Sequence, residues 1–147
     1  MKRSLQYFIL VVATIFIASC EQPSTAPEAP SVAQLLAERY LDAVHKGNYD
    51  SAFAMADPEY FGVRSEKDWK NYFSKVESRL GKFESMKLKQ SLDDNRLTGT
   101  FHMYQFAAKY EKGLAKEMVT MIEKINTNEP LRIFAHRYES SKLMGIE

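Results

Sequence analysis

The sequence predicts an α+β fold in which three N-terminal helices pack on a curved four-stranded antiparallel sheet. Three observations lead to this prediction. Apolar residues recur at intervals of three and four in the first half of the folded region, as one buried face of a helix requires. Beyond Gly81 the interval changes to two, which is typical of strands with one buried face. Turn-forming residues separate these periodic stretches.

The first two helices are marked by the residues at their ends. Ser31 has the spacing of a capping box, and the helical period continues from there to Gly47. Asn48 or Asp50 can begin a second, shorter helix. Asp57-Pro58 ends that helix, because proline disfavours helical backbone in the residue before it. The apolar face of the first helix consists of Ala33, Leu36, Ala37, Tyr40, Leu41 and Val44.

The third helix and the strands follow. Ser65 caps a helix that carries Trp69 and runs to Leu80, and Gly81 ends it. In the strand region, Asp93-Asp94-Asn95 predicts a turn, and a change of apolar phase near 103–104 predicts a bulge. The four predicted strands are 86–92, 97–110, 115–125 and 131–139.

The composition divides the chain into four segments. We expect residues 1–19 to form a signal peptide, 20–31 to contain Cys20 and a Pro-rich tether, 32–140 to form the folded domain and 141–147 a tail. A domain of about 110 residues can bury a hydrophobic core without metals or disulfides. We therefore expect a single folded domain.

The N-terminal segment has the features of an exported lipoprotein precursor. Lys2 and Arg3 precede the apolar stretch from Leu5 to Ala18, which is shorter than the roughly 20 residues that span a bilayer. Ile17-Ala18-Ser19-Cys20 resembles the lipobox of bacterial lipoproteins. The resemblance implies cleavage before Cys20, a diacylglyceryl group on its sulfur and an N-terminal acyl chain. An ordinary secretory leader with a chance cysteine is the alternative.

The residues after Cys20 bear on location. Glu21 stands where enteric lipoproteins retained in the inner membrane carry aspartate, so the resemblance favours the periplasmic side of the outer membrane in a Gram-negative host. Glu21 to Pro30 contains three prolines and no large apolar residue. Such a tether is extended and holds the domain up to about 30 Å from the lipid headgroups.

Charge and motifs exclude several classes of function. The chain has 20 basic and 19 acidic residues, without the clustered basic excess that nucleic-acid binding requires. His45, His102 and His136 lack the paired spacing of metal ligands, and we expect His45 to be solvated near the end of its helix. The sequence has no nucleophile elbow and no phosphate-binding loop. We expect no metal, no catalytic residue and no cofactor besides the lipid on Cys20.

The order of elements resembles the nuclear transport factor two-like, or cystatin-like, superfamily of cone-shaped domains. The stretches that carry the resemblance are Tyr40 to Ala52 (YLDAVHKGNYDSA), Ser65 to Trp69 (SEKDW) and Leu80-Gly81. The resemblance covers about residues 32 to 139 and implies the fold. It says little about activity, because isomerases, dehydratases, binding proteins and transport factors share this fold.

Ketosteroid isomerase, an enzyme of this superfamily, combines a tyrosine on the first helix with an aspartate base and a protonated acid. Tyr40 stands where that tyrosine would. The position of the base falls in Gly62-Val63-Arg64, which has no carboxylate, and Asp57 comes too early. An enolising mechanism needs a base, so the resemblance implies no catalytic site.

Aromatic residues are the candidates for a ligand pocket inside the cone, although each can equally fill the core. The expected function is a lipid-anchored domain that binds an envelope protein or a small apolar ligand without catalysis. Two alternatives stay open: an isomerase- or dehydratase-like enzyme that uses the cone pocket, and a structural homodimer that pairs through the sheet. The candidate pocket residues are Tyr40, Tyr60, Trp69, Phe101 and Tyr104.

Overall fold

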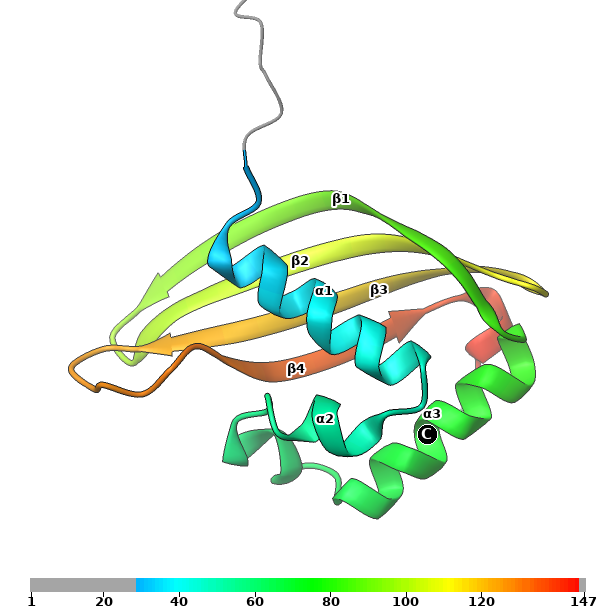
Figure 1. The fold of residues 1–147 in the computed structure, drawn as a ribbon, viewed down its shortest axis with the longest axis horizontal. Helices are drawn as coiled ribbons and strands as arrows, with labels where there is room; N and C mark the ends of the chain where they lie inside the picture. Colours follow the sequence, from blue (N-terminus) through cyan, green and yellow to red (C-terminus); the bar gives the residue numbers. More distant parts are fainter. Residues whose placement is uncertain (1–28, 146–147) are drawn as a thin grey trace, which may run out of the picture.

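The computed structural model describes residues 29–145 and contains a helical N-terminal half and a four-stranded sheet (Figure 1). Cys20, the leader and most of the predicted tether lie outside the described residues. No helix within residues 29–145 is long and apolar enough to cross a membrane. The helices are α1 (Val32–His45), α2 (Tyr49–Phe53) and α3 (Glu66–Leu80), with a 3-10 turn at Pro58–Phe61. The strands are β1 (Phe83–Arg96), β2 (Gly99–Tyr110), β3 (Gly113–Lys124) and β4 (Arg132–Glu139).

The predicted helix caps are confirmed. The side chains of Ser31, Asn48 and Ser65 each accept a hydrogen bond from a backbone N–H in the first turn of α1, α2 and α3. α2 is shorter than the sequence suggested. It ends at Phe53, and Asp57 instead caps the following 3-10 turn.

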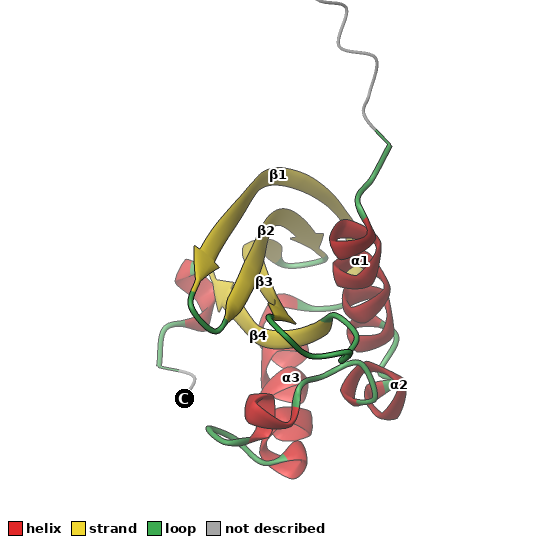
Figure 2. Cartoon of the chain, turned by 90° about the vertical axis from the view of Figure 1, so that its left-hand side faces the viewer, coloured by secondary structure: helices red, strands yellow, loops and turns green. Residues whose placement is uncertain are grey.

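The four strands form an antiparallel sheet in the order β1-β2-β3-β4, as predicted. The sheet curls strongly, and α1 lies along its open side (Figure 2). α1 contacts β2, β3 and β4, and the core fills the space between this helix and the inner face of the sheet. The predicted α+β fold class is therefore confirmed.

The predicted turn at Asp93-Asp94-Asn95 is wrong. These residues continue β1, and the chain reverses at Leu97-Thr98, where Arg96 pairs with Gly99. All three polar side chains are accommodated because this end of the sheet is solvent-exposed. Polar residues that favour turns elsewhere are tolerated in an exposed strand.

The predicted bulge near residues 103–104 is also wrong. β2 pairs with β3 without a shift over its whole length. The apolar phase changes because both faces of β2 carry apolar residues: Tyr104 and Phe106 are buried on the inner face, whereas Phe101 and Met103 lie half-buried on the outer face. The register shifts fall elsewhere, in β1 and at the β3–β4 pair.

The folded chain continues past residue 140. A second 3-10 turn, Ser141–Leu143, contacts α3, and the side chain of Leu143 is buried. The Arg79 guanidinium donates to the carbonyl oxygens of Lys142 and Met144, at 3.4 and 3.3 Å. These contacts hold the C-terminal turn against the end of α3.

Gly99 begins β2 at a place where no side chain fits. A Cβ atom there would lie 2.3 Å from the carbonyl oxygen of Glu123 on β3, and the φ angle of Gly99 is +156°. Gly99→Ala is therefore expected to lower the free energy of unfolding by about 1–3 kcal/mol, measured by urea denaturation. Gly113→Ala is the control, because a Cβ there would meet only the flexible end of Lys142, at 3.3 Å. Equal effects of the two substitutions would contradict the prediction.

Candidate functional site

A carboxylate lies in the middle of the core. Glu117 is on β3, where alternation directs it to the inner face together with Val119 and Met121. Its side chain is 0% exposed. An ionised carboxylate at such a depth is costly unless hydrogen-bond donors surround it.

Three side chains supply those contacts. The Tyr110 hydroxyl donates to Glu117 Oε1 at 2.5 Å, and His45 Nε2 lies 3.1 Å from both carboxylate oxygens. His136 Nε2 lies 3.3 Å from Glu117 Oε2, within ion-pair distance but without the geometry of a good hydrogen bond. The side chains of His45 and His136 are 5% and 0% exposed. The carboxylate therefore joins helix α1 to strands β2, β3 and β4.

The network continues to two further tyrosines. The Tyr40 hydroxyl lies 3.1 Å from His136 Nδ1 and 2.7 Å from the Tyr60 hydroxyl. One arrangement of protons is consistent throughout: Tyr60 donates to Tyr40, Tyr40 donates to His136 Nδ1, and the Nε2 proton of His136 faces Glu117. We call Glu117, His45, His136, Tyr40 and Tyr110 the Glu117 cluster.

The cluster shifts the pKa values of its members. Burial alone would raise the pKa of Glu117, but the contacts with His136 and His45 outweigh it and lower this pKa to about 2. Burial lowers the pKa of His136, which favours its neutral form. Burial and the neighbouring Glu117 charge raise the pKa of Tyr110, so its hydroxyl stays protonated. The cluster thus holds an anionic carboxylate beside the neutral His136 imidazole and the protonated Tyr110 hydroxyl.

A pocket of about 230 Å³ lies beside the cluster. We call it the Phe83 pocket, since the Phe83 ring stacks on the His45 imidazole with ring centres 3.7 Å apart. Both His45 and Tyr110 belong to the cluster and also line the pocket. The Nδ1 atom of His45 is buried and has no hydrogen-bond partner within residues 29–145. The other lining residues are Val44, Tyr49, Phe73, Val76, Glu77, Gly81, Lys82 and Tyr138.

The expectation that His45 is solvated is wrong. His45 is in the last turn of α1, as predicted, but its ring turns inward to Glu117 and is covered by Phe83. A carboxylate in the core outweighs the preference of an imidazole for water.

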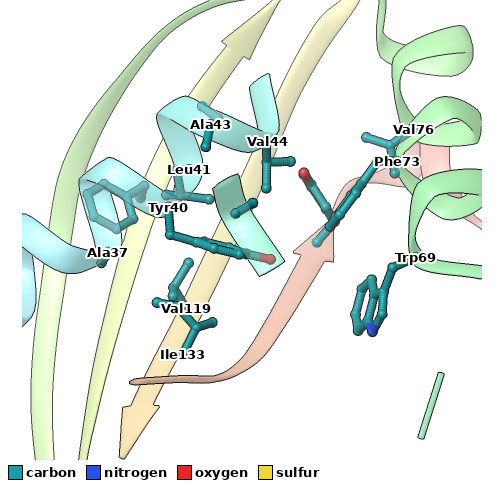
Figure 3. Close-up of a cluster of buried hydrophobic side chains, with 14 of the residues drawn as sticks. Ala37, Tyr40, Leu41, Ala43, Val44, Trp69, Phe73, Val76, Val119 and Ile133 are labelled. Atoms are coloured by element: carbon teal, nitrogen blue, oxygen red, sulfur yellow. The ribbon is translucent and has the colours of Figure 1, made fainter. Parts of the chain in front are cut away.

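The structure places the predicted pocket residues apart from the Phe83 pocket. Tyr40 packs between α1 and the Val119–Ile133 side of the sheet (Figure 3). Tyr60 and Trp69 are buried and stack on each other with ring centres 4.6 Å apart. These three aromatic residues fill the core.

The remaining predicted site residues lie elsewhere. Phe101 is on the outer face of the sheet against Phe134, with ring centres 5.3 Å apart. The Tyr104 hydroxyl lies 2.7 Å from Ser31 Oγ and connects the start of α1 to the sheet. Cys20, the predicted lipid attachment site, lies outside the described residues.

Sequence reasoning missed Glu117, and the reason lies in its strand. Apolar residues occur at both parities of β3, for example Val119 and Met121 against Met118 and Ile122, so the alternation does not show which face Glu117 takes. One signal could have found it: Glu117 is an acidic residue in the third strand of a four-stranded meander, which is a central strand. No group of three or more His, Cys, Asp or Glu residues within 29–145 is arranged to hold a metal ion.

A second buried carboxylate has a structural role. Asp57 is 1% exposed, accepts from the Glu59 backbone N–H at 3.0 Å and pairs with Lys124 Nζ at 2.9 Å. Its own backbone N–H donates to the Ile133 carbonyl at 2.7 Å. These contacts fix the segment after α2 to the edge strand β4, away from the Glu117 cluster.

Comparison with known proteins finds similarity in structure only. Neither the protein-family models nor the curated proteins contain a match. A presumed ketosteroid isomerase from Shewanella frigidimarina superposes with a TM-score of 0.51 at 14% identity, over 74% of this chain and 95% of that one. The Bdellovibrio bacteriovorus protein Bd1075 superposes with a TM-score of 0.49 at 9% identity, over 71% of this chain. This chain covers only 37% of the Bdellovibrio protein.

The similarity to the Shewanella protein concerns the fold. The element order and the four-stranded antiparallel sheet of this chain agree with the architecture predicted from its sequence. Activity does not follow from a shared fold. The chain has a nuclear transport factor two-like fold, with three helices followed by a curved antiparallel sheet.

Proposed function

We propose that this chain is a cell-envelope lipoprotein, acylated at Cys20, whose folded domain binds a small ligand in the Phe83 pocket without catalysis. One observation carries the binding proposal. The walls of the pocket include His45 and Tyr110, whose other contacts reach the fully buried Glu117 carboxylate. The pocket thus combines aromatic and aliphatic side chains with fixed polar groups, as ligand sites do.

Energetics support a role beyond stability. A buried ionic cluster is commonly no more stabilising than a well-packed apolar core of the same volume. Perturbed ionisable groups beside a cavity are more frequent at functional sites than elsewhere. The volume of about 230 Å³ is below the roughly 300–1,000 Å³ of pockets for drug-sized molecules, which indicates a ligand of few atoms.

The proposed anchor rests on Ile17-Ala18-Ser19-Cys20 and the Pro-rich stretch that follows. Two or three acyl chains would hold the protein on a membrane, whereas a single chain binds only marginally. Cys20→Ser is expected to move the protein from the membrane fraction to the soluble fraction of the cell. Ser24→Ala, within the tether, is the control and should stay with the membrane. Unchanged membrane association of the serine variant would refute the anchor.

The binding proposal is tested by NMR on the full chain labelled with ¹⁵N, using benzyl alcohol as the probe. The probe has one ring and one hydroxyl, which the aromatic wall and the Tyr110 hydroxyl can both contact. We expect chemical-shift changes at the amides of Lys82 and Phe83 and none at Ala135 on the outer face of the sheet. Changes confined to the outer face, or no changes at millimolar probe, would overturn the proposal.

Acid–base catalysis is the second candidate, and one observation favours it. Glu117 holds Nε2 of His45 while Nδ1 has no partner within residues 29–145, an arrangement that orients an imidazole as a base. The isomerase pattern is not reproduced, since Tyr40 is bonded to Tyr60 and His136 inside the core. Enolisation of a small ketone such as acetone, followed by NMR as exchange of its methyl protons for deuterium in D2O in the presence of the full chain, would favour this candidate.

A further inference from the structure

We infer that the ligand of the Phe83 pocket is a small alkylammonium cation, of the size and chemistry of choline. The inference rests on the proposed function, because it names the ligand class of the same pocket. Three properties of the pocket carry it: an aromatic lining, carboxylates close to that lining, and a small volume.

The wall includes five aromatic rings, which form two groups of rings in contact. Tyr49 and Phe73 stack with ring centres 5.5 Å apart, and Phe73 meets Tyr138 edge-on at 6.4 Å. Phe83 meets Tyr110 edge-on at 5.6 Å. The faces of such rings carry partial negative charge and attract cations, and cages of aromatic rings are a common means of binding quaternary ammonium groups.

Carboxylates add negative charge around this wall. Glu77 of α3 is itself a lining residue, and burial together with the Glu77 charge raises the pKa of Tyr49. Glu117 lies behind the wall and is ionised. Glu111 reaches the rim, where its carboxylate accepts from the Lys82 backbone N–H at 3.0 Å.

Two lining residues carry basic groups, and neither opposes a bound cation strongly. The His45 imidazole contacts the Glu117 carboxylate through Nε2, so a proton on this ring would cancel the charge of Glu117 and add no net positive charge beside the pocket. Lys82 is exposed, and its flexible side chain can keep the ammonium group in solvent.

The volume selects a compact ligand. A cavity of about 230 Å³ accommodates a trimethylammonium head with a short polar tail but is too small for a steroid or a long acyl chain. The surface of such a head is weakly hydrated compared with a primary ammonium. Desolvation in the aromatic cage therefore costs comparatively little.

The test compares choline with 3,3-dimethylbutan-1-ol, which has the same shape but a carbon atom in place of the charged nitrogen. Both are titrated into the full chain by isothermal titration calorimetry. We expect choline to bind at least five-fold more tightly than the alcohol. Glu77→Gln should reduce choline binding several-fold and leave the alcohol unaffected. Glu84→Gln, an exposed residue of β1 that pairs with Lys109 outside the pocket, should change neither.

The outcomes separate the two proposals. Equal binding of choline and the alcohol would overturn the cation inference while supporting a ligand pocket. Binding of neither would overturn both. Tighter binding of benzoate than of choline would overturn the inference by showing that the pocket prefers an anion.

Discussion

Glu117→Ala is expected to lower the free energy of unfolding by about 3–5 kcal/mol at neutral pH. The substitution removes the charged acceptor shared by the Tyr110 hydroxyl and His45 Nε2 and leaves these two buried groups only each other, 3.2 Å apart. It also opens a cavity at a position with no exposed surface. Urea denaturation followed by tryptophan fluorescence measures the change, with Trp69 as the reporter.

Glu123→Ala provides the matched control for this experiment. Glu123 is on the same strand, but its side chain is 66% exposed and its contact with His102 Nε2 is long, at 3.5 Å. An exposed substitution of this kind changes stability by less than about 0.5 kcal/mol. If Glu117→Ala cost as little as the control, the cluster would not be the tightly coupled unit that its geometry indicates.

The second large effect is a loss of stability in acid. The pKa of Glu117 falls from an ordinary 4.5 to about 2 on folding, so the native state holds this carboxylate deprotonated where the unfolded chain binds a proton. The corresponding stabilisation is complete above pH 4.5 and is lost as the pH falls from 4.5 to about 2. Its size is on the order of 3 kcal/mol, from about 1.4 kcal/mol per pKa unit.

His136 acts in the same direction at higher pH. Burial lowers its pKa below the ordinary 6.5, so the folded state resists protonation and stability begins to decrease as the pH falls through 6.5. Urea denaturation at several pH values between 7 and 2 should therefore show a continuous decrease. Glu117→Gln should flatten the part of the curve between pH 4.5 and 2. Glu139→Gln should flatten it much less, because Lys116 lowers the pKa of the Glu139 carboxyl only at the exposed surface, where water screens the pair.

The side chains that line the Phe83 pocket distinguish between the expected functions. A pocket lined only by aromatic and aliphatic groups would have excluded an enzyme, and the observed pocket is instead lined by His45 and Glu77 and lies beside the Glu117 cluster. Most polar groups of the cluster are bonded to one another, however, and Tyr40 in particular is bonded to Tyr60 and His136. His45 Nδ1 is the exception, since it has no partner within residues 29–145. This arrangement favours a fixed binding site over a set of groups free to exchange protons with a substrate.

The fold was predictable from the sequence where it depends on interactions between residues close together in the chain. The helix limits followed from Ser31 and Ser65, because a cap acts within one turn of its own helix. The strands were found by their period. The hairpin at Leu97-Thr98 was not predicted, because it depends on the pairing of two strands and on an exposed sheet edge that tolerates Asp93 and Asp94.

The sequence by itself determined the helix–sheet order and the caps, and it predicts a lipoprotein leader with Cys20. These features are encoded in neighbouring residues or in a simple period. The tertiary structure alone decided that Glu117 faces inward, that His45 turns away from water, and that Phe83 covers it to form a pocket. The physical reason is that burial of a charge depends on which distant donors the fold brings to it: His45 is 72 residues away from Glu117 in the chain and 3.1 Å away in space.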